Sequence, residues 1–179
     1  GNIWKYMEIP LKYALTKEMV DFISKIEVKK TILDGIQIPT TLVTKLQRQS
    51  LLKSSLFSAK IEGNTLDIKD LRFSPKLNSE YKERLEIENI LLAFSFITKN
   101  KHKEIDIEYI RTLHGIVMKG LSDDKGSIRK EVSAIFNESG FPVYIPPPPS
   151  ELPDLLKKLT FHIAEKTNEN ILIKASLLH

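Results

Sequence analysis

The sequence of 179 residues is long enough for one domain with a hydrophobic core, and 41% hydrophobic with 28% charged residues is typical of a globular protein. It contains no cysteine, which excludes disulfides and cysteine-based zinc sites, and no apolar run approaches the roughly 18 residues of a membrane span. The basic residues behind the net charge of +4 are scattered. We therefore expect a cytoplasmic protein with no membrane partner and no nucleic-acid interaction within these residues.

The first part of the chain is predicted to be an extended arm followed by a helix. Residues 1–15 are expected to be extended, and Thr16 has a side chain preferred at a helix N-cap. Apolar residues then recur on one helical face up to about Lys29. We expect residues 30–40, which contain a glycine and a proline, to form a connector.

The next stretch is a longer helical pattern that ends at an acidic residue. Apolar residues recur at steps of three and four from about Leu42 to Glu62, and Gly63-Asn64 is a strong helix stop. A carboxylate at this end of a helix costs roughly 0.3–1 kcal/mol, because the C-terminus carries partial negative charge. We therefore expect Glu62 to have a cationic partner, and Ser58, one turn earlier, to lie on the same helical face.

Three further helices are predicted in the middle of the chain. Thr65 has an N-cap side chain and precedes a short apolar pattern, so we expect a short helix there and then a loop over residues 72–78. A long helix is expected over residues 79–99. Asp106 is expected to cap the next helix, and Gly120 to stop it.

The pattern then changes from helical to extended. Residues 132–136 and 141–145 flank a turn that contains glycine, and they predict a β-hairpin whose second arm, with its proline, is an edge strand. The four prolines at 146–149 predict a rigid spacer, although their spacing also fits an SH3-type ligand. Ser150 is expected to cap a helix, and the apolar residues 171–179 predict a buried central helix.

These elements predict a mainly α fold with one short β-hairpin in a single compact unit, and the order of the motifs resembles the Fic family. Residues 58–63 (Ser-Ala-Lys-Ile-Glu-Gly) resemble the inhibitory motif of the Fic class whose inhibitory helix precedes the catalytic core. Residues 126–129 (Gly-Ser-Ile-Arg) resemble the start of the family's flap, with Ile in place of the usual aromatic residue, and residues 144–149 resemble its end. Residues 173–179 are similar to the helix that leads into the active-site loop.

The resemblance implies a Fic-type helical bundle. Residues 1–39 would be an N-terminal arm and helix, and residues 40–179 the Fic region, with the inhibitory helix at about 42–63 and the flap at about 126–149. The family's defining loop, His-Pro-Phe-x-Asp/Glu-Gly-Asn-Gly-Arg, is absent from the sequence. We therefore expect a chain that is cut just before this loop, holds no catalytic residue and is inactive alone.

The resemblance also implies an activity for the intact protein, namely transfer of AMP from ATP to a Ser, Thr or Tyr hydroxyl of a target protein. ATP and Mg²⁺ are the implied cofactors, and neither is expected to bind tightly to this fragment. Glu62 would be the inhibitory acid, followed by Gly63, and would pair with a catalytic-loop arginine that otherwise grips the γ-phosphate. Ser58 would add a hydrogen bond to the same arginine. In some relatives the equivalent acid also assists the removal of AMP.

The hairpin would be the flap that receives a segment of the target protein by edge-strand addition. The expected docking residues are Val132, Ala134, Ile135, Val143, Tyr144 and Ile145. Arg129 is expected either to bind a phosphate or to anchor the flap, and both interpretations stay open.

A non-catalytic alternative also stays open, in which the fragment regulates or binds a partner through the flap edge or Pro146–Pro149. A second copy of the chain is kept as a candidate partner. The four histidines show no paired spacing such as His-Glu-x-x-His, so no metal ligand is predicted.

Overall fold

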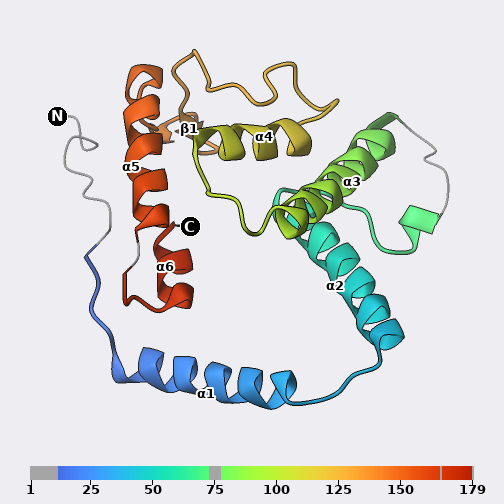
Figure 1. The fold of residues 1–179 in the computed structure, drawn as a ribbon. Coiled ribbons are helices and arrows are strands. Elements are labelled where there is room, and N and C mark those ends of the chain that lie inside the picture. Colours follow the sequence, from blue (N-terminus) through green and yellow to red (C-terminus); the bar gives the residue numbers. More distant parts are fainter. Residues whose placement is uncertain (1–11, 73–77, 166, 179) are drawn as a thin grey trace.

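The computed structural model describes residues 12–72, 78–165 and 167–178, and most of its regular structure is helical (Figure 1). The helices are α1 (Lys17–Asp34), α2 (Thr40–Ile61), α3 (Asn78–Lys99), α4 (Ile107–Val117), α5 (Leu152–Ala164) and α6 (Ile171–Leu178). Short 3-10 turns, η2 (Asp70–Arg72) and η3 (Pro149–Glu151), precede α3 and α5. Strands β1 (Ile135–Phe136) and β2 (Pro142–Tyr144) form an antiparallel hairpin. The predicted mainly α fold with one hairpin is confirmed.

Local capping chemistry sets the helix boundaries that the sequence predicts best. The Thr16 hydroxyl accepts a hydrogen bond from the Met19 amide at 3.2 Å, and the Asp106 carboxylate accepts one from the Tyr109 amide at 2.7 Å. Each satisfies an amide that has no partner within its helix. Both predicted N-caps are confirmed.

Two predicted boundaries near the N-terminus and before α5 are wrong. Helix α1 continues to Asp34 because residues 30–34 contain no breaker, and Lys30 pairs with Asp34 at 3.4 Å one turn apart. The connector is therefore limited to residues 35–39. Ser150 does not cap α5, because it lies within η3, which runs directly into that helix.

The predicted short helix after Thr65 is also absent. The Thr65 hydroxyl donates to the Glu83 carboxylate instead of capping a turn, and only η2 is helical in this segment. The expected loop at 72–78 lies largely outside the described residues, as do most of the predicted N-terminal arm and His179.

The hairpin is shorter than its predicted arms, since β1 has two residues and β2 has three. Ile135 lies opposite Tyr144 and Phe136 opposite Pro142, with a register shift between the two pairs. Asn137 builds the turn, since its side-chain oxygen accepts from the Ser139 amide at 3.1 Å and the Phe141 amide at 2.9 Å.

The buried core lies where α2 crosses α3. Leu56 and Ala59 of α2 meet Ile87 of α3, and the segment after α2 adds partly buried side chains. Half of the predicted apolar stripe of α2 is not buried, because Leu42, Leu46, Phe57 and Ile61 are exposed. Ile97, which lies on the apolar face of α3, is exposed as well.

Helix α3 lies between α2 and α4 (Figure 1). A buried asparagine joins α3 to α4. Asn89 is 1% exposed, and its side-chain amide donates to the carbonyls of Val117 at 2.9 Å and Lys119 at 2.8 Å. These carbonyls lie at the end of α4, where helix carbonyls lack partners within the helix. Asn89 therefore fixes the end of α4 against α3.

Helix α6 packs on the end of α5 through a buried lysine. The Lys174 ammonium donates to the carbonyls of Ile163 at 3.0 Å and Glu165 at 2.8 Å, where a helix C-terminus favours a cation. The prediction of a buried central helix is wrong for α6, because Ile173 and Lys174 are buried but Ile171 is 69% exposed. The described part of the chain, which excludes His179, shows this helix covered on one side only.

Helix α1 has no buried residue and lines an apolar cavity of about 300 Å³ together with α6. A hydrogen bond to Glu169, with some desolvation, raises the pKa of the Tyr13 hydroxyl just before α1.

In the described part of the chain, no helix is both long and apolar enough to cross a membrane.

Replacing Asn89 should test the joint between α3 and α4. We expect Asn89→Ala to lower the free energy of unfolding by about 1–3 kcal/mol, because two carbonyls lose their donor in a buried site. Urea unfolding would measure the loss. Thr98→Ala is the matched control, since the Thr98 hydroxyl is exposed and bonds only within α3. Equal stability of the two variants would contradict this role of Asn89.

Candidate regulatory site at the end of α2

The end of α2 is closed by a Schellman motif. The Gly63 amide donates to the Lys60 carbonyl at 3.1 Å, and the Asn64 amide donates to the Ala59 carbonyl at 3.0 Å. Gly63 has a φ of +98°, a conformation that L side chains rarely adopt, and a Cβ there would meet nothing within 4 Å. The predicted stop at Gly63-Asn64 is confirmed.

Glu62 is the C-cap residue of α2, and its side chain is exposed. Among residues 12–72, 78–165 and 167–178, no side chain forms a hydrogen bond or ion pair with its carboxylate. Lys60, the basic residue of the last turn, pairs with Asp67 instead. The carboxylate therefore stands at the negative end of a helix without a cation from the described residues.

Ser58 lies one turn before Glu62 and is half-buried. Neighbouring Ser55 is fully buried, and its hydroxyl donates to the Leu51 carbonyl at 2.9 Å. In the described part of the chain the Ser58 hydroxyl forms no hydrogen bond with another side chain, so Ser58 and Glu62 share a turn without contacting a common partner.

Asn64 ties this helix end to α3. It is 6% exposed, and its side-chain amide donates to the Glu83 carbonyl at 2.7 Å and to the Glu86 carboxylate at 2.8 Å. Its side-chain oxygen accepts from the Leu66 amide at 3.1 Å. The sequence predicts Asn64 only as part of a helix stop. The position after the left-handed glycine is often hydrophobic, so a polar residue there was a signal for a buried partner.

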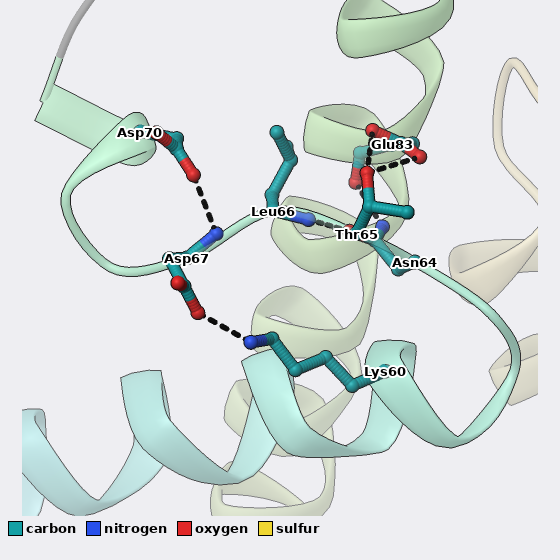
Figure 2. Close-up of polar contacts among 7 residues, drawn as sticks. All are labelled: Lys60, Asn64, Thr65, Leu66, Asp67, Asp70 and Glu83. Carbon is teal, nitrogen blue, oxygen red and sulfur yellow. Dashed lines mark hydrogen bonds and ion pairs between the residues drawn. The ribbon is translucent and has the colours of Figure 1, made fainter.

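The segment after Asn64 folds back along α2 and α3, as Figure 2 shows. The Thr65 hydroxyl meets the Glu83 carboxylate at 3.1 Å, and the Asp67 amide donates to Asp70 at 2.7 Å. Lys60 bonds the Asp67 carboxylate, and this hydrogen bond, followed by the charge of Lys60, lowers the pKa of Asp67. The segment is therefore fastened to both helices next to Glu62.

The base of the flap is fastened to α4 through Gly126. The Arg111 guanidinium donates to the Gly126 carbonyl at 2.9 Å, and the Gly126 amide donates to Nδ1 of His114 at 3.0 Å. Gly126 has a φ of +74°, and a Cβ there would lie 3.2 Å from the Arg111 carbonyl oxygen. Only glycine fits this close approach without a shift of the backbone.

Arg129 bridges the two ends of the flap. Its guanidinium donates to the Glu131 carbonyl at 2.8 Å and to the Pro147 carbonyl on the other side of the hairpin. Both hydrogen bonds of the guanidinium go to backbone oxygens, so Arg129 is placed to anchor the flap. The prolines at 146–149 are half-buried, and the last of them begins η3, which favours the spacer interpretation over an SH3-type ligand.

The predicted docking residues of the flap are mostly solvent-exposed. Ala134 is half-buried, whereas the other five side chains are exposed: Val132, Ile135, Val143, Tyr144 and Ile145. Phe136 and Phe141 of the same hairpin are exposed as well. In the described ranges no group of three or more His, Asp or Glu side chains could hold a metal ion.

Comparison with known proteins identifies the fold. No protein-family model and no curated protein matches the sequence. Among solved structures, the chain is similar to a Fic family protein from Desulfovibrio desulfuricans G20, with 20% identity and a TM-score of 0.74. The match covers 97% of this chain and 52% of that chain, so the chain spans about half the length of the protein it resembles. The chain has the Fic-type fold.

Replacing Gly63 should test the backbone geometry that positions Glu62. We expect Gly63→Ala to lower the free energy of unfolding by about 1–2 kcal/mol, since an L residue is strained at this φ although its side chain has room. Gly63→Asn should lose less, because Asn visits the left-handed region more easily. Unchanged urea unfolding of Gly63→Ala would show that this conformation is not required.

The Lys60–Asp67 pair should make stability depend on pH. The pKa of Asp67 is lower in the folded state, so the pair stabilises the fold above the ordinary carboxyl pKa of about 3.9 and stops doing so as the pH falls through the lowered pKa. Asp67→Asn should therefore be less stable than the wild type at pH 7, and the difference should vanish in acid.

Urea unfolding at both pH values measures this effect, with the exposed Asp123→Asn as the control. A difference between wild type and Asp67→Asn that is independent of pH would contradict the assignment.

Proposed function

We propose that the chain acts within an autoinhibited protein adenylyltransferase, and that Glu62 is the inhibitory acid. The observation that carries this proposal is the position of its carboxylate. It is exposed at the end of a helix, on a backbone held by Gly63 and Asn64, and it lacks a cationic partner among the described residues. The Fic-type fold supports the proposal, because the resemblance of residues 58–63 to an inhibitory motif falls at this helix end.

The reaction proposed for the whole protein is transfer of AMP from ATP to a protein hydroxyl. The hydroxyl oxygen attacks the α-phosphorus, the bond to the β-phosphate oxygen breaks, pyrophosphate leaves, and the hydroxyl proton passes to a general base. Positive side chains that hold the phosphate chain in line are essential to such a transfer. ATP and Mg²⁺ enter this proposal through the resemblance, since the described residues contain no metal-ligand group.

Glu62 would inhibit by competing with ATP for an arginine. A carboxylate and a guanidinium form two parallel charge-assisted hydrogen bonds, which makes such a pair strong and specific in geometry. An arginine held by Glu62 is not available to the γ-phosphate. The pairing would also remove the unfavourable interaction of Glu62 with the helix C-terminus.

The hairpin is the proposed docking site for the target protein. Its exposed apolar side chains and short strands suit an extended peptide that adds to a strand edge. Arg129 and Gly126 would keep this edge in place relative to α4. Edge pairing reads mainly the backbone, so the hydroxyl of the target would be aligned by main-chain hydrogen bonds.

The same exposed hairpin favours a second function, that of a non-catalytic interaction module. In that case the apolar surface of Ile135, Phe136, Phe141 and Val143 would bind a partner protein without nucleotide chemistry. AMP labelling distinguishes the two functions, because only the first requires ATP.

Replacing Glu62 in the protein that contains this region should release AMP transfer. We expect Glu62→Gly to raise incorporation of label from α-³²P-ATP on the order of tenfold to a hundredfold, since a charge-assisted pair is lost. Glu62→Gln should act in the same direction without changing the backbone. Glu104→Gln, at an exposed carboxylate in the loop before α4, should have no effect.

Equal labelling by the wild type and both Glu62 variants would refute the inhibitory role. Loss of partner binding in a hairpin variant, with no AMP transfer in any variant, would instead support the interaction module.

A further inference from the structure

We infer that Asn64 is the positioning residue of the inhibitory site, because its buried side-chain amide fixes the end of α2, and so Glu62, against α3. The inference rests on the proposed function of Glu62. The site then includes Glu62 and also the contact of Asn64 with α3 that positions Glu62.

The bonds of Asn64 use three hydrogen-bonding positions of its side chain in a buried setting. Both amide hydrogens point to oxygens of α3, the Glu83 carbonyl and the Glu86 carboxylate, and the side-chain oxygen accepts from the Leu66 amide. At 6% exposure, water replaces these partners poorly, so a break in them leaves polar groups unsatisfied. The amide therefore holds one geometry.

Asn64 is rigidly connected to Glu62 through the backbone. Its own amide bonds the Ala59 carbonyl, and the Gly63 amide bonds the Lys60 carbonyl, so residues 59–64 form one closed turn. A shift or rotation of α2 that moved Glu62 relative to α3 would have to break the side-chain bonds of Asn64. The position of the carboxylate is thus coupled to this one amide.

The other contacts at this helix end cannot replace Asn64. The Lys60–Asp67 pair and the Thr65–Glu83 hydrogen bond are exposed, where water competes with them (Figure 2). The apolar contacts of Leu56, Ala59 and Ile87 lie earlier along α2, and apolar packing has no fixed direction. Within the described residues, Asn64 is the only residue at the end of α2 whose buried side chain donates hydrogen bonds to α3.

The test compares AMP transfer of Asn64→Ala, Glu62→Gly and the wild type in the protein that contains this region. We expect Asn64→Ala to raise transfer about tenfold, because two buried hydrogen bonds that favour the inhibited arrangement are lost. The double variant Asn64→Ala with Glu62→Gly should transfer AMP no faster than Glu62→Gly alone, since both changes act through the same carboxylate.

Asn89→Ala is the matched control. Asn89 is also a buried asparagine with two hydrogen bonds to carbonyls, and it lies on α3 but faces α4. The Asn89→Ala variant should lower the melting temperature as Asn64→Ala does, but it should not raise AMP transfer. Loss of stability alone is thereby separated from release of Glu62.

A second pair of variants covers the case in which Asn64→Ala does not fold. Glu86→Leu removes one acceptor of Asn64 and should raise transfer, whereas Glu86→Gln keeps an acceptor oxygen and should stay inhibited. Asn64→Asp should release inhibition through repulsion by Glu86, and Glu86→Gln should restore part of it by donating to the new carboxylate.

Activation by Glu62→Gly without activation by Asn64→Ala or Glu86→Leu would overturn the inference and leave the proposed function intact. Activation by Asn89→Ala to the same degree would also overturn it. No activation by Glu62→Gly would overturn the proposed function and the inference together.

Discussion

The side-chain amide of Asn64 is the interaction on which the candidate site depends. Apolar residues bring α2 and α3 together, and their buried contact lies earlier along α2 than Glu62. Asn64 adds directional hydrogen bonds to α3 at the end of α2, and Asn89 joins α3 to the end of α4 in the same way. Helix α3 thus carries both joints, one toward Glu62 and one toward the helix that holds the flap.

Local chemistry explains why much of the fold was predictable from the sequence. Thr16, Asp106 and Gly63 act on amides or carbonyls within a few residues. Thr16 and Asp106 begin their helices and Gly63 ends α2, as predicted. The short helix after Thr65 was predicted wrongly because the hydroxyl bonds Glu83, far along the chain. The same limit applies to α6, where an apolar pattern predicted a buried central helix but Ile171 and Leu172 are exposed.

The candidate site was predictable in part for the same reason. Ser58, Glu62 and Gly63 lie within six consecutive residues, so a short pattern was enough to find them. The bonds of Asn64 to Glu83 and Glu86 join residues that are far apart in sequence, and helical periodicity carries no information on such pairs. The Arg129 guanidinium bonds the Pro147 carbonyl across the hairpin, and no local sequence pattern indicates such a contact.

A crystal structure of the protein that contains this region tests the central claim, that Glu62 is an inhibitory acid placed by Asn64, most directly. We expect the Glu62 carboxylate to form a bidentate pair with a guanidinium at about 2.7–2.9 Å while the amide of Asn64 keeps its bonds to α3. A Glu62 carboxylate that points into solvent, with those Asn64 bonds intact and an arginine free to bind the γ-phosphate, would contradict it.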